Sequence, residues 1–127
     1  MYRIISEIHA VSPIESVTIR KTHKVHGKGE DTLHLVRMSL KRQVNQRAFM
    51  SHLGEKLQTA GFNTMTSGRE HLFTCKAGRE WVVRFTHPSV SEIEIYERKP
   101  GTTNEPVKIK STEEAKIKAA ARKLFRI

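Results

Sequence analysis

The sequence predicts an α+β domain in which an N-terminal β-hairpin region is followed by an α-β-β-β-α unit. Three observations predict it: alternating β-branched segments flank a glycine-containing turn, two later segments repeat apolar residues with helical spacing, and alternating segments lie between those two. Such elements pack as an antiparallel sheet with helices on one face. The length of 127 residues suits one domain, with residues 1–42 as the hairpin region and 43–127 as the core.

The hairpin region is expected to contain only strands. A short strand is predicted at residues 2–11, ended by the Ser12-Pro13 pair. In the last strand the apolar residues change phase after Leu35, which indicates either a bulge or a strand covered on both faces. The hairpin itself is predicted as a strand at 16–25, a turn at 27–31 and a strand at 32–41.

Two helices are predicted in the core. The first spans residues 45–60, with Asn45 as its N-cap and Gly61 after its end. The second spans residues 111–126 and begins with a capping-box pattern, Ser-Thr-Glu-Glu. Between them we expect a loop at 99–106 and three strands, near 63–76, 80–87 and 91–98.

The side chains of these three strands are expected to divide between a buried and an exposed face. Arg84 is expected to pair across strands with Glu92 or Glu94 on the exposed face. The aromatic residues divide similarly: Phe73, Trp81 and Phe85 are expected in the core, whereas Tyr2 and Tyr96 are candidates for exposed positions that stack on bases.

The chain is strongly basic, with a formal net charge of +10 and a pI near 10.1. Residues 16–42 and residues 106–127 each contain seven Lys or Arg and two Asp or Glu, so each segment carries +5. Residues 43–105 carry only +1 and residues 1–15 carry −1. Because the excess is confined to two segments, we expect a polyanionic partner.

The first basic segment fits a two-stranded ribbon that enters a major groove or follows phosphates. The glycines of its Gly-Lys-Gly turn leave no side chain between backbone amides and an anion. The alternative is a solvated edge hairpin whose lysines prevent aggregation. The binding candidates in this segment are Arg20, Lys21, His23, Lys24, His26, Lys28, Arg37, Lys41 and Arg42.

The second basic segment is dominated by the predicted C-terminal helix, whose apolar side suits the sheet and whose basic side suits phosphates. The alternatives are an ordinary lysine-rich surface helix, or a helix that binds anionic membranes. The membrane alternative is disfavoured because the core needs the apolar side. The binding candidates in this segment are Lys108, Lys110, Lys116, Lys118, Arg122, Lys123 and Arg126.

Residues 45–127 resemble the double-stranded RNA-binding domain in their α-β-β-β-α order. The last helix, STEEAKIKAAARKLF, matches that family's final helix in the spacing of Ser111, Ala115, Lys116, Ala119, Ala120 and Leu124. Thr112-Glu113 stands where the family has a basic pair, and KAGRE replaces the family's first hairpin turn. The resemblance implies shape-based binding across RNA grooves, with Lys116 as a phosphate contact.

No metal or catalytic motif stands out. On a strand, a three-residue separation places His23 and His26 on opposite faces, which argues against a joint metal site. The EIEIYERK segment contains the acids and lysine of a metal-dependent nuclease, but it lacks an evident second acid nearby, so solvent-face charges are the preferred interpretation. The single cysteine, Cys75, lies in an apolar strand and is interpreted as a buried, inert thiol.

We therefore expect a small cytoplasmic protein that binds RNA or DNA, mainly by phosphate and shape recognition, without catalysis, cofactor or metal. We expect no membrane partner, since neither a secretory signal nor a membrane-spanning stretch is evident. The alternative is an inhibitor or adaptor that docks its basic patches on an acidic protein. A further alternative is a structural component of a ribonucleoprotein or virion. The sequence does not distinguish RNA from DNA and does not indicate the oligomeric state.

Overall fold

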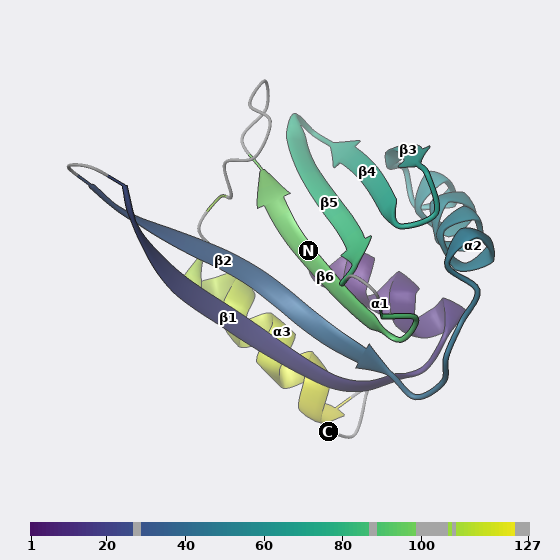
Figure 1. Cartoon of the computed structure of the whole chain (residues 1–127), viewed down its shortest axis with the longest axis horizontal. Helices are drawn as coiled ribbons and strands as arrows, with labels where there is room; N and C mark the ends of the chain where they lie inside the picture. Colours follow the sequence, from purple (N-terminus) through teal and green to yellow (C-terminus); the bar gives the residue numbers. More distant parts are fainter. Residues whose placement is uncertain (27–28, 87–88, 99–106, 108, 124–127) are drawn as a thin grey trace.

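The computed structural model describes residues 1–26, 29–86, 89–98, 107 and 109–123, with the side chains of 21–26, 29–34 and 123 left undescribed. Six strands form one antiparallel sheet in the order β1-β2-β6-β5-β4-β3, which confirms the α+β class (Figure 1). The elements are α1 (Tyr2–Val11), β1 (Ile14–His26), β2 (Gly29–Leu40), α2 (Gln46–Thr59), β3 (Asn63–Ser67), β4 (His71–Lys76), β5 (Arg79–Phe85), β6 (Glu92–Arg98) and α3 (Ser111–Lys123).

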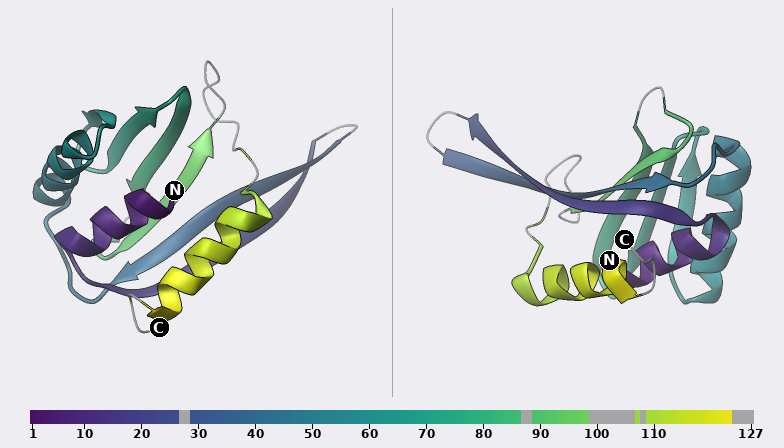
Figure 2. Two further views of the ribbon diagram at one scale, coloured as in Figure 1. Left: turned by 180° about the vertical axis from the view of Figure 1, so that it is seen from behind. Right: turned by 90° about the horizontal axis from the view of Figure 1, so that it is seen from below.

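All three helices lie on one face of the sheet, as the two views of Figure 2 show. Helix α1 occupies the middle of this layer and contacts both α2 and α3, although it comes first in the sequence. The opposite face of the sheet, called the open face below, is covered by none of these helices. None of the described helices is long and apolar enough to cross a membrane.

The expected strand at residues 2–11 is wrong, because this segment forms helix α1. Its buried residues, Ile4, Ile5 and Ile8, are spaced for one side of a helix and not for one face of a strand. All three are at most 1% exposed and belong to the main core. Burial of this stripe against the sheet outweighs the modest strand preference of isoleucine.

The expected single strand at 63–76 is also wrong, because this segment forms a hairpin of β3 and β4. Gly68 adopts a φ of +69° in the connecting turn, a conformation that glycine adopts without strain. The segment after α2 therefore contains four strands before α3, one more than predicted. Because β3 is only five residues long and mostly exposed, it lacks the apolar alternation that marks a strand in sequence.

The predicted caps of the first helix are confirmed. The Asn45 side chain accepts a hydrogen bond of 3.0 Å from the backbone N–H of Ala48, which satisfies an otherwise unpaired donor of α2. Gly61 follows the helix with a φ of +90°.

The expected division of side chains between two sheet faces is confirmed for most positions. Trp81, Val83 and Phe85 point toward the helices, where Phe85 packs edge-on against Phe49 of α2 with ring centroids 5.5 Å apart. Phe73 differs from the expectation, because it lies on the open face. The phase change in β2 is explained by coverage on both faces, since Val36 joins the main core while Leu35 is buried on the open face with Val82 and Tyr96.

The connection from α1 to β1 depends on a neutral histidine. Nδ1 of His9 accepts a hydrogen bond of 3.0 Å from the backbone N–H of Ile14, the first residue of β1. Burial lowers the pKa of His9 below its ordinary value of 6.5, and the positive charge of Lys41 lowers it further. The folded protein therefore favours the unprotonated ring that this hydrogen bond requires.

We expect the free energy of unfolding to fall as the pH drops below about 6.5, because the unfolded chain then binds a proton that the folded chain resists. The variant His9→Gln should show a smaller loss over the same range. Urea denaturation at about pH 7.5 and about pH 5.5 measures both slopes. Equal pH dependence in the parent and the variant would show that His9 does not control this transition.

Candidate nucleic-acid interface

The β1–β2 hairpin extends beyond the sheet as a two-stranded ribbon. The two strands pair from Ile14 opposite Leu40 to His26 opposite Gly29, whereas β2 pairs with β6 only at residues 36–39. Residues 20–26 and 29–35, called the projecting ribbon, therefore have no third strand paired beside them in the part of the chain that the structure describes. Figure 1 shows this ribbon leaving the body of the protein. It contains the candidates Arg20, Lys21, His23, Lys24 and His26.

The register separates candidates that the sequence had placed together. Lys41 and Arg42 follow β2 at the end opposite the turn, beyond all twelve paired positions of the hairpin. At about 3.4 Å per residue, the two ends of the hairpin lie roughly 40 Å apart. Lys41 and Arg42 therefore belong to a different surface from Lys24.

Arg37 lies over the sheet and is held by carboxylates. Its guanidinium Nε is 3.1 Å from Oε1 of Glu94 and 3.2 Å from Oε1 of Glu92. Glu94 also accepts from Arg84, with Nη2 at 3.2 Å, which confirms the expected cross-strand pair. Because Glu94 is only 6% exposed and lies between two arginines, the charge of Arg37 is largely balanced within the sheet.

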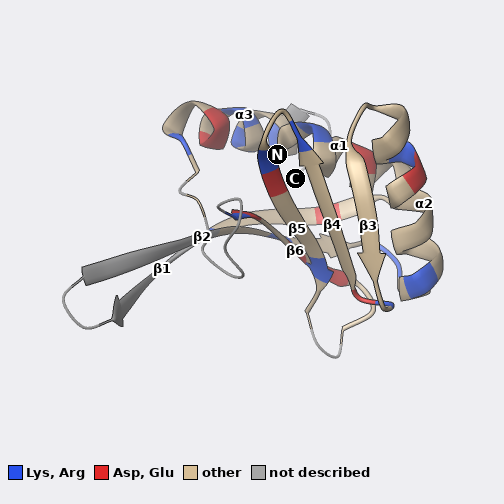
Figure 3. Ribbon diagram, turned by 90° about the horizontal axis from the view of Figure 1, so that it is seen from above, with Lys and Arg blue, Asp and Glu red and all other residues tan. Residues whose placement is uncertain are grey.

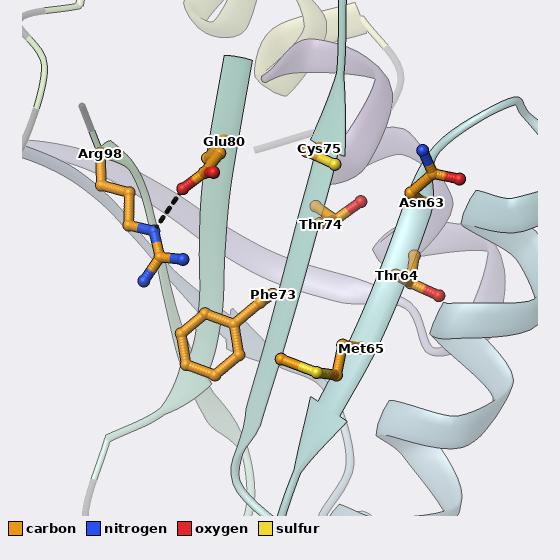
Figure 4. A pocket seen from close by; sticks show the side chains of 8 residues that line it. All are labelled: Asn63, Thr64, Met65, Phe73, Thr74, Cys75, Glu80 and Arg98. Atoms are coloured by element: carbon orange, nitrogen blue, oxygen red, sulfur yellow. Dashed lines mark hydrogen bonds and ion pairs between the residues drawn. The ribbon is translucent and has the colours of Figure 1, made fainter. Parts of the chain in front are cut away.

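Other arginines on the open face also have partners within the protein. Nε of Arg98 lies 2.8 Å from a carboxylate oxygen of Glu80, and its guanidinium stacks over Phe73 at 4.9 Å (Figure 4). Arg84 lies over the Tyr96 ring at 5.2 Å. Of the two tyrosines expected at exposed positions, Tyr96 is only 6% exposed, which makes that prediction wrong, whereas Tyr2 is 37% exposed.

A shallow pocket of about 210 Å³ lies between Arg98 and strand β3. Figure 4 shows Phe73 and Met65 facing its centre, with the Cys75 thiol further along β4. Cys75 is partly exposed there, in contrast to the buried thiol that was expected. The pocket is lined by Asn63, Thr64, Met65, Phe73, Thr74, Cys75, Glu80 and Arg98.

Helix α3 has the expected apolar and basic sides. Ile117 and Ala120 are buried against the body, whereas Lys116 and Arg122 are exposed and have no carboxylate partner in the part of the chain that the structure describes. Lys118 is 61% exposed and forms a helical pair with Glu114 at 3.2 Å. Lys110, just before the helix, is exposed. Lys28, Lys108, Arg126 and the side chain of Lys123 lie outside the described residues.

Acidic residues at the start of α3 attach the helix to the body. Glu113 lies 2.9 Å from the α-amino group of Met1 and 3.5 Å from Arg79. Burial alone would raise the pKa of Glu113, but the two cations together outweigh burial and lower it. The two ends of this helix therefore differ: its beginning is charge-balanced, and its later turns leave cations exposed.

Two basic residues that the sequence analysis missed lie close together at the start of α2. Arg47 and Arg69 line a hollow of about 420 Å³ together with Val44, Asn45, Gln46 and Val90. Both are exposed, without a carboxylate partner among the described side chains. Figure 3 shows Lys and Arg at this end of α2 and along α3. Residues 43–105 carry a charge of only +1, so this segment did not stand out as basic and neither arginine was a candidate. The sequence feature that indicated an unbalanced Arg47 is the absence of acidic residues from the first turn of α2.

The described residues include no group of three or more His, Cys, Asp or Glu side chains positioned to hold a metal ion. The acids of the EIEIYERK segment instead contact arginines: Glu92 and Glu94 on the open face, and Glu97 with Arg79 on the helix side. These contacts agree with the interpretation of the segment as strand-face charges.

Comparisons with known proteins give no further guide, because no family model, no curated protein and no solved structure matches the chain significantly.

Proposed function

We propose that this protein binds nucleic acid through phosphate contacts, without catalysis, using the projecting ribbon and the exposed side of α3. The observation that carries the proposal is that some basic side chains are paired with carboxylates whereas others are not. Arginines over the sheet are paired with carboxylates, whereas Arg20, Lys116 and Arg122 are exposed and lack such a partner among the described residues. Unpaired surface cations bind phosphates at less cost, because no internal ion pair must be broken.

The shape of the ribbon supports the same proposal. A two-stranded antiparallel ribbon fits the major groove of B-DNA, which is about 12 Å wide. Among the described strands, none pairs with the outer edge of either strand of the ribbon, which suits contact with a ligand along its length. Since no base-reading motif is evident, contacts to phosphates and to overall shape carry the proposed recognition.

The sequence of the last helix resembles the final helix of the double-stranded RNA-binding domain, although four strands, not three, lie between α2 and α3. Duplex RNA is therefore a ligand to test beside duplex DNA, with Lys116 among the proposed contacts. We further propose that the protein acts in the cytoplasm, since its one cysteine leaves no internal disulfide to require an oxidising compartment.

Fluorescence anisotropy with labelled duplex RNA, duplex DNA and single strands of about 20 nucleotides tests the proposal. Raising the salt from about 50 mM to about 200 mM should weaken binding at least about tenfold, which is the loss expected for two phosphate contacts. Absence of binding to every form at low salt would overturn the proposal and direct attention to an acidic protein partner.

A further inference from the structure

Strand β1 is an edge of the sheet. Among the described strands it pairs only with β2, and the strand order places it at the end of the row. In an antiparallel edge strand, every second residue points its N–H and C=O away from the sheet. These groups form a ready-made line of donors and acceptors for another extended chain.

A groove of about 390 Å³ runs beside this edge, between β1 and α3. Ile117 of α3 is 1% exposed, and Val17 and Ile19 of β1 pack against the core as partly buried residues, so the floor of the groove is apolar. Glu114, Lys118 and Arg122 of α3 form the rim, where Lys118 pairs with Glu114 at 3.2 Å and Arg122 has no carboxylate partner among the described residues. The groove is lined by Val17, Thr18, Ile19, Glu114, Ile117, Lys118, Ala121 and Arg122.

We propose that this groove binds an extended, acidic segment of a partner protein, which adds to β1 as a seventh strand. An extended peptide presents backbone N–H and C=O groups alternately, as the edge of β1 requires, and directs every second side chain toward one face. Apolar side chains on that face would contact the partly buried residues Val17, Ile19 and Ala121. Acidic side chains at other positions on the same face would contact Arg122 at the rim, which is exposed and has no carboxylate partner among the described residues. This contact supplies the preference for an acidic partner.

Two other occupants fit the groove less well. A nucleic-acid backbone has phosphates to accept from the N–H groups of β1, but its negative charge is repelled by the carbonyl oxygens between them. A second copy of the chain would bring two β1 strands together, each with Arg20, Lys21 and Lys24 against only one acid, Glu15. Like charges on adjacent strands are unfavourable, so a heterologous acidic segment is favoured. This inference goes beyond nucleic-acid binding: it shares Arg122 with the proposed nucleic-acid interface but depends on the edge of β1 and on the apolar floor of the groove.

A labelled synthetic peptide of about eight residues, with valine and glutamate in turn at the odd positions and threonine at the even positions, places both side chains on the face toward α3 and tests the proposal on the full chain. We expect saturable binding by anisotropy and slower backbone hydrogen exchange at residues 16–20. A peptide with lysine in place of glutamate should bind at least about tenfold more weakly, because it repels the rim. A peptide N-methylated at alternate residues should lose at least about tenfold, because it lacks the donors for strand addition.

The variant Ala121→Arg separates the groove from simple charge attraction. Arginine here occupies the groove while it adds a positive charge, so peptide binding should fall although electrostatic attraction rises. Binding to a nucleic-acid duplex should not weaken in this variant, which keeps failure of this proposal distinct from failure of the proposed function. A thermal melt confirms that the variant is folded.

Undiminished peptide binding by Ala121→Arg, or full binding of the N-methylated peptide, would overturn the proposal. A duplex that protects residues 16–20 where the peptide does not would assign the groove to nucleic acid instead.

Discussion

Reversing the charge of Lys24 and Lys28 together is expected to weaken binding to duplexes of many sequences alike. If both lysines contact phosphates, their loss lowers the slope of log affinity against log salt by about 1.8, since each contact to duplex DNA contributes about 0.9. The loss should be uniform across sequences because phosphate contacts carry no base information. Anisotropy titrations at several salt concentrations, with at least three unrelated duplexes, measure both quantities.

A matched control reverses two positive charges near the opposite end of the strand order, far from the ribbon. Lys56→Glu with Lys76→Glu also lowers the formal net charge by four, from +10 to +6. Lys56 lies in α2 and Lys76 in β4, and strand order places β4 far from β1. Because Lys76 donates to the Ala60 carbonyl at 3.0 Å and lies over the Phe62 ring, a thermal melt must show that the control is folded. This control should keep most of the salt slope. An equal loss in both variants would mean that net charge alone drives binding, and parental binding by the ribbon variant would remove the ribbon from the interface.

The same design applies to α3. Lys116→Glu with Arg122→Glu removes two exposed cations that have no described carboxylate partner, and neither contributes to the buried side of the helix. Combined with the ribbon variant, the losses should add, because independent and distant sites behave additively. A loss from the ribbon alone would reduce the proposed interface to one arm.

The sequence predicted those elements whose local signals agree with their packing. The helix after Asn45 has a cap, an apolar stripe and a terminal glycine, and all three persist in the structure. The segments around Trp81 and Ile93 alternate cleanly because one side of each faces the helices. In such segments the residues that repeat with the period of the element are the same residues that are buried in the structure, so the pattern predicts the element correctly.

The elements that the sequence predicted wrongly are those whose secondary structure depends on contacts with distant parts of the chain. Helix α1 is short and rich in isoleucine, which favours a strand locally. Its position between α2 and α3 buries the apolar stripe, and this burial favours the helix. Strand β3 is nearly all exposed, and pairing with β4, not burial, defines it. A single sequence contains no direct sign of either partner.

The candidate site shows the same limit. Sequence located the basic segments but not which cations are free, because ion pairing joins residues far apart in the chain. Arg37 meets Glu94 from 57 positions away, while Arg47 and Arg69 converge on one hollow from different elements. Segment charge is therefore a guide to the class of partner and a poor guide to the contacting residues.

The largest effect on stability is expected from Glu94→Gln. Glu94 is 6% exposed on the open face and accepts from both Arg37 and Arg84. Loss of its charge leaves two guanidinium groups close together without a shared carboxylate. Removing one partner of a buried ion pair typically costs 3–5 kcal/mol, but both arginines are about one-third exposed, so we expect a loss of about 2 kcal/mol in the free energy of unfolding.

Urea denaturation measures the loss, with Glu55→Gln as the control at an exposed glutamate of α2. A loss no greater than that of the control would show that the network contributes little.

A triple variant, Arg37→Met, Glu94→Leu and Arg84→Met, replaces the whole ion-pair network. It separates the net contribution of these ion pairs to the free energy of unfolding from the cost of removing one partner alone. Apolar replacements of similar size remove the two unbalanced charges, so most of the stability should return. Nucleic-acid affinity should remain near the parental value in this variant, because its net charge falls by only one and the removed arginines are paired inside the sheet. Strong loss of affinity would place the open face, and not only the ribbon and α3, in the interface.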